Sequence, residues 1–372
     1  MDLPWQSPLL EGVDLSISND SDKQKVEFLL SIQRLLNEGS FVATYKYALL
    51  IALADLSIEC SDTGESQEIG TRQIAEKFIE YYWRQTIPFI SPEKGEKGIL
   101  KQNPGGQAAI LNLIVKARIE ANGSLARAKQ ETKAWWKLVE KVKATIKAMP
   151  LWKLQTIGRG EVPFLYKNTR SGNAIELLPN VAHHFRIFHE LILNLVQGAW
   201  VRHVRRIQDN QKLFGEIVDL REFLFGSERE NLGEYRPILK EIQSGSCFYC
   251  RKLIHGPGDI DHFIPWTRYP IDLGHNFVLA HAECNRHKRD YLAAEDHLEH
   301  WLCRNAEWPD QLRNFFEEKG ILNNLTTSVQ ITKWAYETAE LSRSHVWVKN
   351  NEIRPISSHW RNLFLGSLWD GN

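Results

Sequence analysis

Apolar residues recur at close to helical spacing along much of the first half of the chain. From Lys23 to Leu36 they mark one face of a predicted helix, at Val26, Leu29, Leu30, Ile32 and Leu36. The stretch from about Thr44 to Ile58 is apolar almost throughout, interrupted by Lys46 and Asp55. A helix that is apolar on all sides is buried, and this one is too short to cross a bilayer. The pattern therefore predicts a core helix.

The same spacing predicts further helices and one extended segment. Thr71 is a plausible N-cap for the helix that follows it. Later helices are expected over three ranges, Ala108–Ala121, Ser124–Ala148 and Val181–Phe214. Residues 162–179 favour a β-hairpin with a turn near Ser171–Gly172. The fold class expected from these patterns is mainly α.

A polar stretch around Gly226 to Gly233 is the preferred domain boundary. A short helix at Tyr235–Gln243 leads into a segment rich in cysteine, and after Asp290 helical patterns with many tryptophans continue to the end. We therefore expect three parts: a mainly helical N-terminal domain (1–225) for substrate or partner recognition, a small module (226–300), and a helical C-terminal extension (301–372) that packs on the rest.

Composition narrows the class of protein only slightly. The 372 residues have a formal net charge of zero, so a nucleic-acid partner would have to be recognised by local basic surface. The first residues, M-D-L-P-W-Q-S-P, lack the basic and apolar regions of a secretory signal. The expectation is a cytoplasmic protein with no membrane partner.

Three of the five cysteines fall in one short segment, which favours a metal site over disulfides. Cys247 and Cys250 have the spacing that lets one tight turn aim two thiolates at an ion, and His281 and Cys284 repeat it. This set predicts a structural zinc site. Buried cysteines without metal are the alternative, and His255 and His287 are near enough in sequence to replace His281.

Between the two pairs stands D-I-D-H-F-I-P-W, in which Asp261 and His262 are adjacent. Together with Asn276 and the run from His281 to Lys288, this pattern resembles the HNH nuclease family, which shows C-x-x-C, D-H-x-x-P, an Asn and C-x-x-C-[HN]-x-x-K in that order. The resemblance covers roughly fifty of the 372 residues. The sequence departs from the motif at His281, which replaces a cysteine. At the [HN] position of the motif it has Asn285, a variant that the family contains.

The resemblance implies a ββα-metal HNH module with endonuclease activity. It makes His262 the general base, Asn276 the residue that holds the His262 loop and ring in the productive orientation, and Asp261 and Asn285 the ligands of a catalytic Mg²⁺ or Mn²⁺ separate from the structural Zn²⁺. Products with 5′-phosphate and 3′-hydroxyl ends are expected. The cations placed for the nucleic-acid backbone are Lys288, Arg286 and Arg289.

Each of these residues has an ordinary structural alternative. His262 could be a strand histidine, Asn276 a turn former and Asn285 a helix N-cap. Asp259 is expected to be a solvated neighbour of Asp261. The cations beyond the module could contact phosphate or form a solvated helix face; they are the lysines of 124–148 and Arg202, Arg205 and Arg206.

Three functions are compatible with the sequence. The first is a metal-dependent DNA endonuclease, placed by analogy in bacterial restriction or anti-phage defence, with an ATPase or other defence protein as a partner. The second is an RNA-cleaving or toxin-like nuclease with the same site. The third is a zinc-stabilised binding module without catalysis. Cutting two strands with a single-site nuclease would favour a homodimer or two successive nicks.

Overall fold

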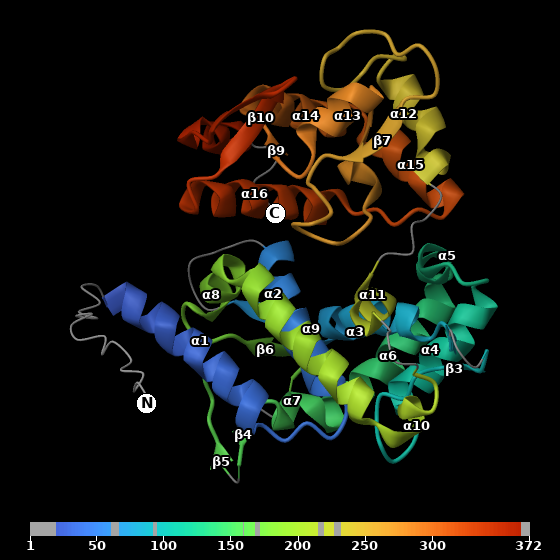
Figure 1. Cartoon of the computed structure of the whole chain (residues 1–372), viewed down its shortest axis with the longest axis vertical. Helices are drawn as coiled ribbons and strands as arrows, with labels where there is room; N and C mark the ends of the chain where they lie inside the picture. The colour runs from blue at the N-terminus through green and yellow to red at the C-terminus, as the bar shows by residue number, and fades with distance from the viewer. Residues whose placement is uncertain are drawn as a thin grey trace, which may run out of the picture.

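The computed structural model describes residues 20–60, 67–91, 95–158, 160–167, 172–214, 219–226 and 232–365. Helices dominate, and the strands form small sheets of two or three strands. Figure 1 shows two lobes, with helices α1 to α11 in one and the later elements in the other. The expected mainly helical fold is confirmed.

The first lobe is a helical assembly. Its helices are α1 (Asp20–Glu38), α2 (Tyr45–Glu59), α3 (Thr71–Gln85), α4 (Ala109–Glu120), α5 (Leu125–Gln130), α6 (Thr132–Ala148), α7 (Pro150–Lys153), α8 (Val181–Ile187), α9 (His189–Arg206), α10 (Gln208–Gln211) and α11 (Leu220–Phe225). Its strands are β1 (Glu68–Gly70), β2 (Phe89–Ile90), β3 (Lys97–Gly98), β4 (Thr156–Ile157), β5 (Gly160–Glu161) and β6 (Ala174–Glu176).

Helix α2 is the centre of this lobe, as its apolar composition predicts. Positions 46 to 58 are all buried, and α3, α8 and α9 pack around the helix. The burial includes Lys46 and Asp55, the two charged residues of the stretch. Asp55 is satisfied by hydrogen bonds from Tyr81 and His189 at 2.6 Å each, which explains how a core helix carries a carboxylate.

Several predicted element boundaries are corrected. Thr71 is the first residue of α3 and not its N-cap: the cap is Gly70, whose N–H donates to the side chain of Gln73 at 2.9 Å. The single helix expected over Ser124–Ala148 breaks at Glu131 into α5 and α6, and the helix expected from Val181 is divided into α8, α9 and α10. Propensity does not show such breaks because tertiary packing decides them.

The expected hairpin at 162–179 forms only in part. Tyr166 and Leu177 meet in one antiparallel bridge, but strand β6 pairs with β1, from a distant part of the chain. The turn expected at Ser171 and most of the polar boundary before residue 232 lie outside the described residues.

The second lobe combines the cysteine segment with the C-terminal helices. Its helices are α12 (Arg236–Ile242), α13 (Ala282–Lys288), α14 (Glu295–Glu307), α15 (Pro309–Lys319) and α16 (Leu325–Leu341). Its short 3-10 helices are η1 (Leu232–Tyr235), η2 (Gly274–Asn276) and η3 (Ser358–Phe364). Its strands are β7 (Asp259–His262), β8 (Phe277–Ala280), β9 (Leu292–Ala293), β10 (His345–Lys349) and β11 (Glu352–Pro355).

The helices expected after Asp290 are confirmed by α14, α15 and α16, and the structure adds a hairpin near the end. Strand β10 pairs with β11 antiparallel and with β9 parallel, so the extension shares a sheet with the chain that leaves α13. Buried tryptophans join the parts: Trp301 stacks on Phe263 with ring centroids 5.3 Å apart, and Trp334, Trp347 and Trp360 belong to the same core. Trp369 lies outside the described residues.

The described residues form three hydrophobic cores, which divide close to the predicted boundary. The first runs from Phe28 to Leu224, and the second contains Cys247 and later residues together with Ile58 of α2. The third packs η1 and α12 against β8 and α15. The divisions at 225/226 and 300/301 stay predictions. In the part of the chain that the structure describes, no helix has both the length and the apolar character needed to cross a membrane.

Candidate active site and metal centre

The four predicted zinc ligands come together at the junction of a tight turn and a helix. Cys247 and Cys250 lie in a turn closed by hydrogen bonds from Cys247 N to Lys252 O and from Arg251 N to Cys247 O, both 2.9 Å. His281 is the N-cap of α13, and Cys284 lies in its first turn. One ligand atom from each of the four residues lies within 4.8 Å of the others.

This geometry suits zinc. Ligands about 2.3 Å from a tetrahedral ion lie roughly 3.8 Å apart, within the span observed. His281 Nε2 lies 3.1 Å from the carbonyl oxygen of Leu253, and Nδ1 lies 3.3 Å from the Cys250 sulfur, so a carbonyl orients the ring toward the thiols. Burial, followed by the neighbouring Cys247 and Cys250, raises the pKa of the Cys284 thiol. Because the four ligand atoms lie this close together, the group could bind zinc, with His281 as its histidine.

The candidate catalytic residues lie on the ββα unit of β7, β8 and α13, whose helix begins with two of these four residues. Strand β7 pairs antiparallel with β8, with His262 opposite Phe277 and Asp261 opposite Val278. Side chains alternate along a strand, so Asp259 and Asp261 share one face and His262 lies on the other. Helix α13 packs against the face that carries the two aspartates.

His262 is held by a carboxylate. Its Nε2 lies 2.7 Å from Oδ1 of Asp272, and its ring packs against Phe277 with centroids 4.6 Å apart and against Trp266 at 5.7 Å. The side chains of His262 and Asp272 are 19% and 16% exposed, so the pair opens to solvent on one side. Sequence reasoning missed Asp272, because a lone acid in a loop carries no signal until the fold brings it to the histidine.

Asp261 lies in a buried polar network. The Tyr249 hydroxyl donates to its Oδ2 at 2.5 Å, and Lys288 Nζ lies 3.1 Å from the same oxygen. Burial, followed by the charge of Asp261, raises the pKa of Tyr249 well above its ordinary value, so the phenol stays protonated and donates. Lys288 was expected to contact phosphate, but its side chain is fully buried, and it also donates to the carbonyl oxygen of His262 at 2.9 Å. That expectation is corrected: Lys288 is an internal ion-pair partner here.

Asn276 hydrogen-bonds to the backbone just after His262. Its Oδ1 accepts from the backbone N–H of Ile264 at 2.8 Å, and its Nδ2 donates to the Ile264 carbonyl at 2.9 Å. The backbone oxygen of Asn276 also accepts from Phe263 N at 2.7 Å. These bonds hold the His262 loop by its backbone, and none of them reaches the histidine ring.

Asn285 faces Asp259. Its Nδ2 donates to Asp259 Oδ2 at 3.3 Å, so Asp259 is not merely a solvated neighbour. The cap of α13 is His281, which excludes an N-cap role for Asn285. Asp259 and Asp261 on β7 and Asn285 on α13 carry carboxylate and amide oxygens, the donor type that Mg²⁺ and Mn²⁺ prefer.

His262 and the two aspartates are neighbours along strand β7, but their side chains lie on opposite faces of it. Among the described residues, no hydrogen bond joins the His262 ring to Asp261 or Asn285; the two groups meet at the end of β7, where Lys288 contacts both Asp261 and the His262 carbonyl. Arg286 and Arg289 lie nearby on α13 and just after it, and both are exposed.

Comparison with known families assigns two regions of the chain. Residues 244–294 match the HNH endonuclease family, so this lobe contains an HNH endonuclease domain, which implies nuclease activity on a nucleic-acid substrate. Residues 24–220, more than half of the chain, match a family described as a domain of unknown function (DUF8808), and the chain belongs to that family. Searches among curated proteins and solved structures returned no match.

Proposed function

We propose that the protein is a metal-dependent endonuclease that hydrolyses phosphodiester bonds in DNA, with His262 as the general base. The observation that carries the proposal is the pairing of His262 with Asp272 at the end of the strand that also bears Asp259 and Asp261. A phosphodiester lying over this end of β7 would meet the histidine on one side and the oxygen donors on the other.

The tautomer of His262 follows from its partner. A carboxylate at Nε2 favours a proton on that nitrogen, which leaves Nδ1 as the atom that accepts a proton from the attacking water. Asp272 would then stabilise the imidazolium formed in the reaction. Asn276 would keep the backbone after His262 in place through its two bonds to Ile264.

HNH nucleases generally use a divalent metal, and the oxygens of Asp259, Asp261 and Asn285 would hold Mg²⁺ or Mn²⁺. When bound there, such an ion supplies positive charge that offsets the charge developing on the phosphate and the leaving oxygen. The Cys247, Cys250, His281 and Cys284 group would hold a structural Zn²⁺ that joins β8 and α13 to the cysteine turn. Arg286 and Arg289 would contact the nucleic-acid backbone.

The test is cleavage of supercoiled plasmid in the presence of Mg²⁺, Mn²⁺ or EDTA. Wild type should nick the plasmid only with added metal, and His262→Ala should lower the rate by at least about 100-fold, because general-base catalysis contributes on that scale. His255→Ala is the matched control, since His255 is an exposed histidine of the same domain and should cut at the wild-type rate.

Equal cutting by wild type and His262→Ala would overturn the assignment of the base. A parallel reaction with single-stranded RNA separates the substrates: cleavage of RNA with no cleavage of plasmid would replace DNA with RNA in the proposal.

A further inference from the structure

The loop that follows His262 is a contact between the two lobes. Tyr269, in the middle of this loop, is buried, and its hydroxyl donates to Oε1 of Glu59 at 2.7 Å. Glu59 is the last residue of α2, the central helix of the first lobe. Figure 1 shows α16 of the second lobe facing α2, so the loop enters at the place where the lobes meet.

Glu59 is fixed by a chain of ion pairs in the first lobe. Lys77 Nζ lies 2.5 Å from Glu59 and 3.1 Å from Glu80, and Lys129 Nζ lies 2.7 Å from Glu80. Burial opposes the ionised form of Glu80, but Lys129 and Lys77 outweigh it and lower the pKa of this carboxyl to about 2. Burial raises the pKa of Glu59 itself, against the opposing charge of Lys77. The acceptor of the Tyr269 hydroxyl is thus joined through Lys77 to the charged network of Glu80 and Lys129.

Tyr269 is also enclosed by aromatic rings. Its ring stacks on His189 of α9 with centroids 5.7 Å apart and meets Trp334 of α16 edge-on at 5.9 Å. His189 is in turn bonded to Asp55 of α2 at 2.6 Å. Three helices thus hold this side chain, so its position is set by the packing of both lobes.

The hydrogen bond from Tyr269 to Glu59 lies close to Asp272 along the chain. Ile271 N donates to Tyr269 O at 2.9 Å, and Gly274 N donates to Leu322 O at 2.8 Å, so the backbone is held on both sides of Asp272. Side chains alternate in an extended segment. Ile271 and Leu273 accordingly line one side, and Asp272 turns the other way to His262.

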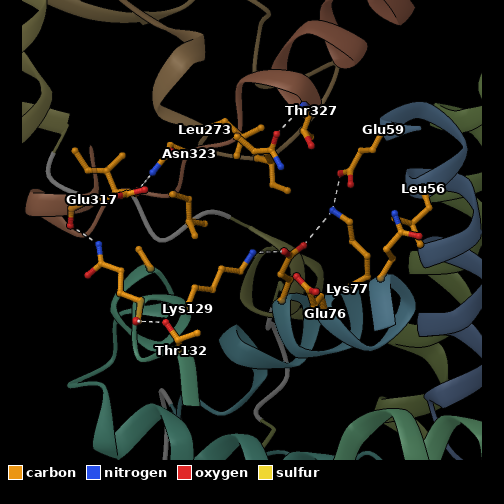
Figure 2. Close-up of a pocket in the computed structure, with 18 residues that line it drawn as sticks. Leu56, Glu59, Glu76, Lys77, Lys129, Thr132, Leu273, Glu317, Asn323 and Thr327 are labelled. Carbon is orange, nitrogen blue, oxygen red and sulfur yellow. Dashed lines mark hydrogen bonds and ion pairs between the residues drawn. The ribbon is translucent and has the colours of Figure 1, made fainter. Parts of the chain in front are cut away.

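The side that Ile271 and Leu273 line is a cavity of about 760 Å³ between the lobes. Figure 2 shows Glu59, Lys77 and Lys129 on one wall of this cavity, with Leu273, Asn323 and Thr327 on the other. The charged network of the first lobe therefore borders one side of residues 271–273, and Asp272 contacts His262 from the other side.

We propose that the N-terminal domain is a positioning element of the nuclease: the bond from Tyr269 to Glu59 sets the loop that aims Asp272 at His262. The inference rests on the proposed role of His262 as the base. Tyr269 and Glu59 are positioning residues, because they act through Asp272 and touch neither substrate nor metal ligand.

The experiment compares Tyr269→Phe with wild type in the plasmid assay. Loss of the hydroxyl should lower kcat on the order of 10- to 100-fold, the cost of small misplacement of a catalytic group, with KM and DNA affinity unchanged. Tyr166→Phe is the matched control: the Tyr166 hydroxyl is also buried and donates at 2.6 Å to Leu151 O, but far from the loop. Its kcat should equal that of wild type, and circular dichroism should show all three proteins folded.

A double-mutant cycle tests whether the effect passes through Asp272. In an Asp272→Asn background, Tyr269→Phe should lower kcat no further, because the group that Tyr269 positions is already lost. Additive losses, or a wild-type kcat for folded Tyr269→Phe, would overturn the inference. The His262→Ala result separates the two failures: if His262→Ala is inactive while Tyr269→Phe is fully active, the positioning role fails and the proposed base stands.

Discussion

At the scale of single residues, burial decides roles that residue type leaves open. Lys288 matches a lysine of the family motif and was expected to contact phosphate, yet its amine lies inside the domain on Asp261. Tyr249 donates to the same carboxylate. A buried carboxylate needs such partners, because an unpaired charge away from water is costly. The metal ligand expected at Asp261 is therefore held in place before any ion binds.

This pairing makes Lys288→Met a test of the buried site. Removing the ammonium leaves Asp261 with a single hydrogen-bond partner, so the free energy of unfolding should fall by about 3 kcal/mol, as when a buried ion pair loses one member. Urea denaturation without added Mg²⁺ measures it. Lys252→Met, at an exposed position, should change stability by less than about 0.5 kcal/mol. Similar unfolding of both variants would show that the ion pair contributes nothing.

At the scale of elements, the candidate site stands on a short antiparallel strand pair and a two-turn helix. Strands β7 and β8 have four residues each and α13 has seven, too few to be stable alone. His281 and Cys284 begin α13, while Cys247 and Cys250 precede β7. A zinc ion bound to all four would therefore cross-link the elements that carry His262 and Asn285.

Cys284→Ser should remove this cross-link. We expect the zinc content, measured by atomic absorption, to fall from about one ion per chain to near zero, and the melting temperature of this lobe to fall by on the order of 10 °C. Cys303→Ser is the control, since Cys303 is an exposed cysteine outside the group and should leave both values unchanged. Full zinc content in Cys284→Ser would exclude Cys284 as a ligand.

At the scale of the whole molecule, the region that matches the family of unknown function packs against the HNH lobe. Trp334 of α16 donates to the Arg186 carbonyl at 2.8 Å, and Arg186 is ion-paired with Glu337 at 2.9 Å, in addition to the tie between Tyr269 and Glu59. The basic stretches of the first lobe, predicted to contact phosphate or solvent, stay open as predictions. These contacts between the lobes are the basis of the positioning role proposed for the first lobe.

A nuclease with a single HNH domain per chain should cut the two DNA strands in separate events unless two chains act together. In a plasmid time course, the open-circle form should therefore accumulate before the linear form. Sedimentation under the same conditions gives the oligomeric state. Linear product appearing in one step from a strictly monomeric protein would contradict this prediction.

The parts of the fold that were predicted correctly are those with strong local sequence signals. The core helix α2 and the helical first lobe follow from periodicity, and the ββα motif is implied by the resemblance to HNH nucleases that Cys247, Asp261, Asn276 and Cys284 carry. The errors come from tertiary packing. The break at Glu131 and the β1–β6 pairing depend on what packs against each segment, and hydrophobic spacing does not report it.

The sequence by itself determined the class of chemistry, because metal ligands and a catalytic histidine need particular residue types at particular spacings, and those are visible in a single chain. Only the tertiary structure decided which acids face which partners. Asp259 meets Asn285, Lys288 is buried on Asp261, and Asp272 reaches His262. It also decided that Tyr269 lies on Glu59 of a distant helix. Such contacts depend on strand register, helix rotation and lobe packing, which are set by the whole core and not by neighbours along the chain.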